Sequence, residues 1–255
     1  MRTIIAANWK MFKTRADAAS CAVDLARGLE GGLPAGREVL IFPPYTALTV
    51  VAEAVAKTPG LAVGGQNVYP ESEGAFTGEI SPAMLRDAGA SWVLAGHSER
   101  RSLFCEAPAF VARKTVFALE QGLNVMLCVG ETLTQREAGH LEAVLEAQLA
   151  PVCAALPPAL TGEALARRLA VAYEPVWAIG TGKVAGPPEV QEAHAVTRAL
   201  LHRALGDAAV QLPILYGGSV KPANAATLLG LDNVDGLLVG GASLEAQSFL
   251  QIVFC

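Results

Sequence analysis

The chain has 255 residues, 52% of them hydrophobic, which permits one large domain or two small ones. Its formal net charge of −5 argues against the basic surface that binding to nucleic acid needs. No apolar run reaches the roughly 18 residues of a membrane helix. The five cysteines are widely spaced and include no Cys-x-x-Cys pair, which predicts a reduced, cytoplasmic protein without disulfides or a zinc site.

Short apolar runs recur along the chain, and each of them ends in polar or glycine residues. They are continuously apolar rather than alternating, which is typical of parallel strands buried on both faces. Eight strands are therefore predicted, at Thr3–Ala7, Glu38–Phe42, Leu61–Gly65, Ser91–Ala95, Asn124–Val129, Leu169–Tyr173, Leu212–Tyr216 and Gly236–Val239.

Between these runs lie segments in which apolar residues recur with the period of a helix. Proline stands near the expected first turn of further helices at Ser81-Pro82 and Lys221-Pro222, which fits a helix start. The longer helices are predicted at Ala16–Leu29, Tyr45–Ala56, Pro108–Gln121, Thr134–Leu149 and Pro188–Leu205.

Eight strand–helix units in about 250 residues predict an α/β fold, a (β/α)8 barrel that forms a single domain over residues 1–255. A doubly wound sheet is the competing architecture. It usually has fewer strands and, when it binds a dinucleotide, a glycine-rich turn after the first strand. Here the first strand leads into Asn8-Trp9-Lys10, with no glycine, so the barrel is favoured.

The active site of such a barrel forms where its strands end at their C-termini. Glu174 closes the sixth strand, and Pro175 and Trp177 stiffen the chain that follows. Glycines come next, so that residues 175–185 resemble a lid with firm hinges and a flexible tip. Closure of this lid would desolvate the carboxylate and raise its basicity, which suits a general base. The alternative is a solvated loop glutamate.

Two further polar side chains follow strands. His97 ends the fourth strand unit just before a helix start, where the positive helix end disfavours an imidazolium, so we expect a neutral hydrogen-bond donor. The other histidines, His140, His194 and His202, are predicted to be surface or packing residues. Lys10 is the only lysine directly after a strand, and its charge would complement an anionic substrate and an oxyanion. A structural histidine and an ordinary surface lysine are the alternatives.

Paired glycine turns follow the seventh and eighth strands, at Gly217-Gly218-Ser219 and Gly240-Gly241-Ala242-Ser243. Each precedes a predicted helix, so exposed backbone N–H groups and the helix dipole can bind a phosphate. Barrels of this class frequently bind phosphate at this place. Plain tight turns are the alternative.

With these residues assembled, the chain resembles the triosephosphate isomerase family. Other phosphate-binding barrels share the glycine turns but not the Asn/Lys, His and Glu set. The matching motifs run almost from end to end: Ala7-Asn8-Trp9-Lys10, Gln66-Asn67, Gly74-Ala75-Phe76-Thr77-Gly78-Glu79, Gly96-His97-Ser98-Glu99-Arg100-Arg101, Cys128-Val129-Gly130-Glu131, Ala172 to Gly182, Tyr216-Gly217-Gly218-Ser219-Val220 and Val239 to Leu244.

The resemblance implies an isomerase of glycolysis and gluconeogenesis that interconverts dihydroxyacetone phosphate and D-glyceraldehyde 3-phosphate through an enediolate, with no metal or cofactor. Glu174 would move the proton between the two carbons, and neutral His97 would polarise the carbonyl. Lys10 would stabilise the enediolate, Asn8 would help to position it, and Glu99 would support the site beside Lys10. The implied substrate-binding residues are Asn8, Lys10, Gly180, Ser219, Gly240 and Gly241.

The segment Gln66–Glu79 resembles the family's dimer loop, which implies a homodimer. Phe76 at its tip would otherwise be an exposed aromatic residue, and Thr77 would contact the partner's Asn8–Lys10 region. A surface loop without a partner is the alternative. The chain departs from the family at Val184, in the second hinge of the lid, where the family usually has threonine.

Two other functions remain open. A different phosphate-binding barrel, such as a lyase or an aldolase with a Schiff-base lysine, typically needs that lysine at a strand end such as the sixth. This chain has Glu174 there. A barrel that only binds partners or serves as a scaffold would have no need of Asn8, Lys10, His97 and Glu174 together.

Overall fold

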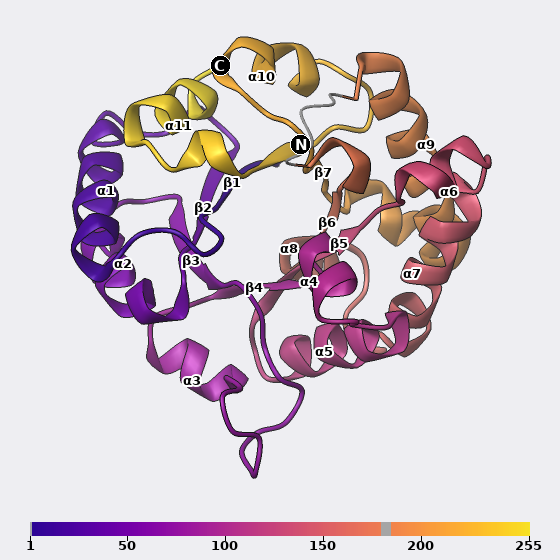
Figure 1. The fold of residues 1–255 in the computed structure, drawn as a ribbon, viewed down its shortest axis with the longest axis horizontal. Coiled ribbons are helices and arrows are strands. Elements are labelled where there is room, and N and C mark those ends of the chain that lie inside the picture. The colour runs from indigo at the N-terminus through magenta and orange to yellow at the C-terminus, as the bar shows by residue number, and fades with distance from the viewer. Residues whose placement is uncertain (1, 180–184) are drawn as a thin grey trace.

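The computed structural model describes residues 2–179 and 185–255, and at its centre eight parallel strands form a closed barrel. The strands pair in chain order, and β8 pairs again with β1. Helices form an outer ring around them (Figure 1). The predicted (β/α)8 barrel is thus confirmed, with strands β1 (Thr3–Asn8), β2 (Arg37–Phe42), β3 (Leu61–Gly65), β4 (Trp92–Ala95), β5 (Asn124–Val129), β6 (Leu169–Tyr173), β7 (Ile214–Tyr216) and β8 (Gly236–Val239).

All eight predicted strands are present, four of them with the predicted bounds. The largest difference is at β7, which begins at Ile214 and not at Leu212. Pro213 has no N–H to donate to a neighbouring strand. The N–H of Leu212 instead donates to the carbonyl of Ala209, 3.2 Å away, in the turn that precedes the strand. The fourth strand likewise begins one residue later than predicted, at Trp92.

The helical elements are α1 (Arg15–Gly28), η1 (Tyr45–Ala47), α2 (Leu48–Val55), α3 (Pro82–Asp87), α4 (Ser98–Leu103), α5 (Pro108–Glu120), α6 (Leu133–Glu137), α7 (Leu141–Ala155), α8 (Gly162–Arg168), η2 (Val176–Ala178), α9 (Pro187–Leu205), η3 (Gly206–Gln211), α10 (Pro222–Leu229), η4 (Gly241–Ser243) and α11 (Ala246–Val253), where η marks a 3-10 turn. None of the helices in the described part of the chain has the length and apolarity to span a bilayer.

The single helix predicted over Thr134–Leu149 is wrong. Two helices, α6 and α7, occupy this stretch, and Gly139 between them has a φ of 72°. This left-handed conformation ends a helix and is readily adopted by glycine. The apolar period continues across the break, so it could not reveal the break. The helix predicted over Tyr45–Ala56 likewise begins as the 3-10 turn η1 before α2.

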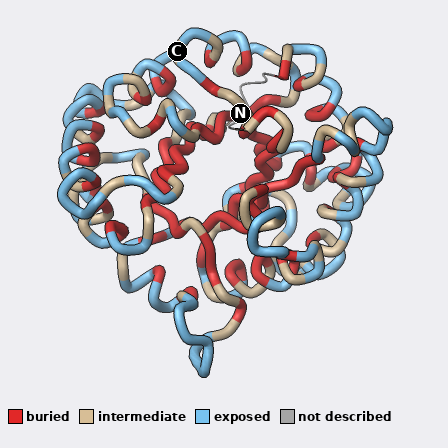
Figure 2. The backbone as a smooth tube through the Cα atoms, in the orientation of Figure 1, coloured by how far each residue is buried: buried red, intermediate tan, exposed pale blue. Residues whose placement is uncertain are grey.

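The apolar core has two layers because successive side chains of a strand point to opposite faces. In β1, Ile4 and Ala6 point into the barrel, whereas Ile5 and Ala7 pack against the surrounding helices. Gly64 of β3 makes room inside the barrel for Phe42, whose Cε1 lies 2.3 Å from where a β-carbon of residue 64 would be. The strands are accordingly the most continuously buried part of the chain (Figure 2).

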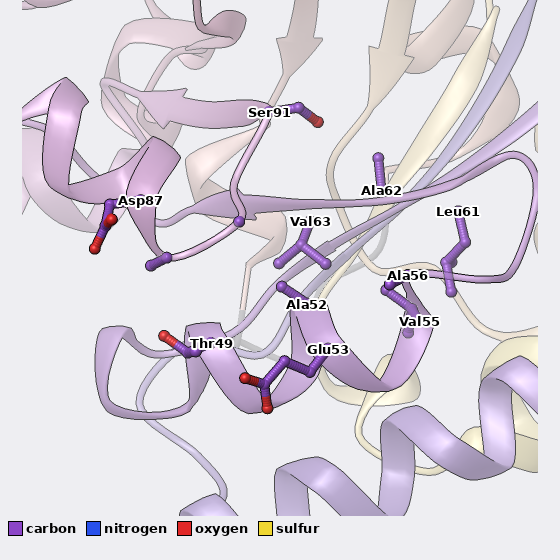
Figure 3. A pocket seen from close by; sticks show the side chains of 12 residues that line it. Thr49, Ala52, Glu53, Val55, Ala56, Leu61, Ala62, Val63, Asp87 and Ser91 are labelled. Atoms are coloured by element: carbon purple, nitrogen blue, oxygen red, sulfur yellow. The ribbon is translucent and has the colours of Figure 1, made fainter.

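On the outer face of β3, the cover of helices is incomplete. The helix α3 is short. Just after it, Gly89 lies so close to α2 that a β-carbon at residue 89 would be 2.7 Å from the β-carbon of Ala52. Beside this contact a groove runs between α2, α3 and the strand (Figure 3). Small and apolar side chains form its floor, and the carboxylates of Glu53 and Asp87 lie at its edges.

His194, one of the predicted surface or packing residues, is a packing residue. It is fully buried in α9, and its ring stands edge-on to Tyr173 with 5.8 Å between the centroids. Its Nδ1 lies 2.8 Å from the carbonyl oxygen of Asn233. Burial lowers the pKa of His194 from 6.5 to about 4, because there is little solvation for an imidazolium.

This burial makes the free energy of unfolding depend on pH. Between pH 6.5 and 4 the unfolded chain binds a proton at this histidine and the folded chain does not, so stability falls as the pH falls. We predict that the wild type loses about 3 kcal/mol more than His194→Gln between pH 8 and pH 4. Urea unfolding at a series of pH values measures this difference.

The matched control is His202→Gln, because the side chain of His202 is 59% exposed. Its stability should follow that of the wild type at every pH. If the free energy of unfolding changes with pH in the same way in the wild type and in His194→Gln, the prediction is contradicted.

Candidate active site

The ends of β1, β4 and β6 bring four predicted site residues together. Asn8, Lys10, His97 and Glu174 line one cavity at the C-terminal end of the barrel. The cavity is completed by Ile179, Gly217, Gly218, Leu238 and Gly240.

The carboxylate of Glu174 is held by two donors. Its Oε1 lies 2.9 Å from Nε2 of His97, and its Oε2 accepts a hydrogen bond of 2.9 Å from the backbone N–H of Ser98. The side chain is only 2% exposed. Ser98 is the first residue of α4, so the carboxylate also lies at the positive end of a helix. No local pattern marks the contact with Ser98, because the two residues are 76 positions apart.

These contacts act against the desolvation that lid closure was expected to bring. Burial alone raises the pKa of Glu174. However, the facing imidazole of His97, its hydrogen bond and the N–H of Ser98 outweigh burial and hold the pKa of Glu174 below its usual value. A carboxylate that left these donors would be a stronger base.

Glycine on both sides makes room for Glu174. A β-carbon at Gly130 would lie 1.8 Å from the carbonyl oxygen of Glu174, and one at Gly217 would lie 2.9 Å from its Cγ. Two atoms that are not bonded cannot lie 1.8 Å apart, so residue 130 cannot carry a β-carbon here. A β-carbon at residue 217 would push the side chain of Glu174 out of its place. The position of Glu174 thus depends on two glycines, one directly after β5 and one directly after β7.

His97 makes hydrogen bonds through both ring nitrogens. Its Nδ1 accepts the N–H of Glu99 at 3.2 Å, so the ring proton is on Nε2, which donates to Glu174. Burial opposes protonation of His97, yet the carboxylate of Glu174 more than compensates and raises the pKa of His97. The charge of this imidazole therefore depends on where Glu174 lies.

Lys10 adopts a strained backbone conformation, with a φ of 51°. Such a conformation costs about 1–2 kcal/mol for a residue with a β-carbon. Three hydrogen bonds hold the residue in place. Its N–H donates to Oδ1 of Asn8 at 3.0 Å, its carbonyl accepts from Nε2 of Gln66 at 2.8 Å, and its Nζ donates to Glu99 at 2.7 Å. The position of Gln66 in this set was not foreseen from the sequence.

Glu99 links the cation to the imidazole. Its Oε1 binds Nζ of Lys10, and its Oε2 lies 3.5 Å from Nδ1 of His97. Its side chain is about two-fifths exposed, so the negative charge is partly solvated. The structure thus places Glu99 beside Lys10, where the family resemblance expected it.

The predicted phosphate-binding residues are only partly described. Gly240 lines the cavity, and the Cε of Lys10 passes 3.5 Å from where its β-carbon would be. Ser219 is half-buried and Gly241 is exposed, each beside the cavity residues Gly218 and Gly240 in sequence. Gly180 and the other residues of the predicted lid from 180 to 184, Val184 among them, lie outside the described residues.

Within residues 2–179 and 185–255, no three His, Cys, Asp or Glu side chains are grouped so that they could hold a metal ion. The cavity instead combines a carboxylate, an imidazole, an ammonium group and glycine turns. Such a set can move a proton between a carbon acid and a base while fixed donors stabilise an oxyanion.

Comparisons with known proteins agree on one family. The family model for triosephosphate isomerase matches residues 3–254. Triosephosphate isomerases from Oleidesulfovibrio alaskensis and from Nitratidesulfovibrio vulgaris strain Miyazaki F are each 55% identical to this chain over 253 residues, which is 99% of both sequences in each pair. The crystal structure of triosephosphate isomerase from Bartonella henselae superposes with a TM-score of 0.87 at 39% identity, covering 99% of this chain and 98% of that one.

The contact between Glu174 and His97 predicts how the imidazole titrates. In Glu174→Gln the negative charge is lost, so burial is no longer outweighed and the pKa of His97 should fall below that of the wild type. The nitrogen chemical shifts of the His97 ring, followed by NMR from acid to alkaline pH, measure this change.

A smaller decrease is expected for Glu99→Gln, since Glu99 contributes less to the pKa of His97 than Glu174 does. An unchanged pKa of His97 in Glu174→Gln would contradict the described pair.

Proposed function

The chain belongs to the triosephosphate isomerase family, and we propose that Glu174, His97 and Lys10 perform its reaction. The enzyme interconverts dihydroxyacetone phosphate and D-glyceraldehyde 3-phosphate, a step of glycolysis and gluconeogenesis. The reaction removes a proton next to a carbonyl group and returns one to the neighbouring carbon.

The observation that carries the assignment is the buried pair of Glu174 and His97, with 2.9 Å between Oε1 and Nε2. In this proposal the substrate takes the place between the two side chains. The carboxylate then leaves His97 and removes the proton from the carbon. The Nε2–H of His97 becomes free to donate to the carbonyl oxygen, and the enediolate forms.

Lys10 supplies the positive charge that the enediolate and the phosphate need. Its Nζ is only partly buried and is shared with Glu99, so it can turn toward an anion without leaving the site. Asn8 sets the backbone of Lys10 through its Oδ1 and lines the same cavity. We assign the phosphate to the N–H groups of Gly180, Ser219, Gly240 and Gly241, beside the ammonium group.

We assign the role of a lid to residues 175–185. Its first hinge is held at two points on Glu131. The N–H of Val176 donates to the carbonyl of Glu131 at 3.1 Å, and the indole Nε1 of Trp177 donates to its carboxylate at 2.9 Å. A closed lid would exclude water from the enediolate and suppress loss of phosphate.

We also propose that two copies of this chain associate through the Gln66–Glu79 loop. The loop projects from the barrel below α3 (Figure 1), and most of its residues are exposed (Figure 2). Inside the loop Phe76 packs on Tyr69, with 4.4 Å between the ring centroids, and it stays 38% exposed. Met11, which follows Lys10 in the chain, is 95% exposed, and Leu103 at the end of α4 is 72% exposed. A partner that covered these apolar groups would also contact the loop that carries Lys10.

A cytoplasmic location completes the proposal. All five cysteines are free, and two of them, Cys105 and Cys255, are exposed. Free exposed thiols fit a compartment that keeps thiols reduced.

The most informative test of the proposed base compares the wild type with Glu174→Gln in a coupled isomerase assay. An amide cannot accept the proton, so kcat should fall about 10²- to 10⁴-fold. Glu137→Gln is the matched control, because Glu137 is an exposed glutamate outside the site, and its kcat should equal that of the wild type.

Near wild-type turnover of Glu174→Gln would remove Glu174 from the mechanism. If the wild type shows no isomerase activity, the alternative is tested by borohydride trapping with a ketose phosphate. A covalent adduct would then indicate a Schiff-base aldolase.

The dimer is tested by light scattering at micromolar concentration. The wild type should have the mass of two chains of 26.4 kDa each. Met11→Glu puts a charge on the apolar surface and should shift the mass toward one chain, since a buried unpaired charge is costly.

Val210→Glu is the matched control, because Val210 is an exposed apolar residue in η3, away from this surface. It should keep the mass of the wild type. A wild-type mass of one chain would refute the interface.

A further inference from the structure

A second cavity lies behind Glu174, on the side away from the substrate residues. It lies between α4, α6 and the first hinge of the proposed lid, and its volume is about 200 Å³. Here it is called the rear cavity, and its lining consists of Gly96, Ser98, Arg101, Ser102, Val129, Gly130, Thr132, Gln135, Gln148, Glu174 and Val176.

Glu174 is the one described residue that lines both the rear cavity and the substrate-side cavity. Its two carboxylate oxygens have different neighbours. Oε1 faces His97, which lines the substrate side, whereas Oε2 accepts the N–H of Ser98, which lines the rear cavity. The side chain of Glu174 therefore forms a wall between the two spaces.

The rear cavity leads from solvent to this wall. Ser102 and Thr132 at its rim are exposed, whereas Ser98 and Glu174 at its floor are buried. Hydroxyl and amide groups line the passage, among them those of Ser102 and Gln135. A polar cavity of this size holds several water molecules, because one water needs only about 10–15 Å³ of such volume.

We propose that the rear cavity is a proton-exchange port, through which the carboxyl group of Glu174 exchanges its proton with solvent during the isomerase reaction. The inference rests on the proposed function. When the substrate fills the front cavity, water reaches Glu174 from behind. The port thus sets how often the proton that Glu174 has removed is replaced before it is returned.

The exchange conserves charge. Once Glu174 has removed the proton from carbon, its carboxyl group is neutral. The carboxyl group turns so that the protonated oxygen faces the rear cavity, where it gives this proton to one water molecule and takes a solvent proton, or a deuteron in D2O, from another, and then turns back. The deuteron then goes to the neighbouring carbon of the enediolate. The product carries deuterium in place of the hydrogen that was removed.

The experiment is the reaction in D2O, starting from unlabelled D-glyceraldehyde 3-phosphate. Proton NMR measures the fraction of product that carries deuterium at the carbon that received the proton, and the coupled assay measures kcat and KM. Ser102→Leu fills the mouth of the port. Ser102→Ala removes the same hydroxyl group without filling it and is the matched control.

We expect the deuterated fraction to fall roughly two-fold or more in Ser102→Leu, because water no longer reaches the rear of Glu174. In Ser102→Ala the fraction should equal that of the wild type. A third variant, Gln135→Ala, widens the passage and should raise the fraction. In all three the values of kcat and KM should stay close to those of the wild type.

An unchanged deuterated fraction in an active Ser102→Leu enzyme would overturn the port, since exchange would then go through the substrate side. If Ser102→Leu does not fold, Gln135→Ala decides, and an unchanged fraction in that variant overturns the port equally. Failure of the proposed function looks different, because the wild type would then show no turnover at all.

Discussion

A buried carboxylate without partners is prohibitively costly, and Glu174 meets this constraint with two N–H donors from the start of α4. Much of the site follows from this arrangement. Gly130 and Gly217 must lack side chains so that Glu174 can lie where it does. The fourth strand must end shortly before His97, which directly precedes a helix, so that the imidazole and the next backbone N–H reach the carboxylate together.

The same contacts set the electrostatics of the proposed mechanism. In the resting arrangement the pKa of Glu174 is held low and that of His97 is raised, so each side chain stabilises the charge that the other would carry. Separation of the pair by a substrate reverses both effects. The glutamate becomes more basic and the histidine favours its neutral form, which are the states that proton abstraction and carbonyl polarisation need. Lys10 and Glu99 form a second charged pair beside Glu174 and His97.

The fold was predictable because the strands are buried on both faces and are therefore continuously apolar. Their ends located Asn8, Lys10, His97 and Glu174, and the structure brings these side chains to one cavity. Their roles, which came from the family resemblance, stay predictions.

What the sequence could not show depends on long-range contacts or on single dihedral angles. The amide of Gln66 reaches the carbonyl of Lys10 across 56 positions, and no local pattern marks it. Gly139 breaks the helix predicted over Thr134–Leu149 through its φ of 72° while the apolar period continues. The direction of the pKa shift of Glu174 was also beyond the sequence, since it depends on donors that oppose burial.

The central claim is that two donors hold Glu174 in a weakly basic resting state from which a bound substrate releases it. Its most direct test is a titration of the 13C-labelled carboxyl group of Glu174 by NMR, with and without a planar phosphate ester that mimics the enediolate. The account predicts a pKa below the usual value in the free protein and an increase when the ester binds. A pKa that is not lowered in the free protein, or that is the same with the ester bound, would contradict it.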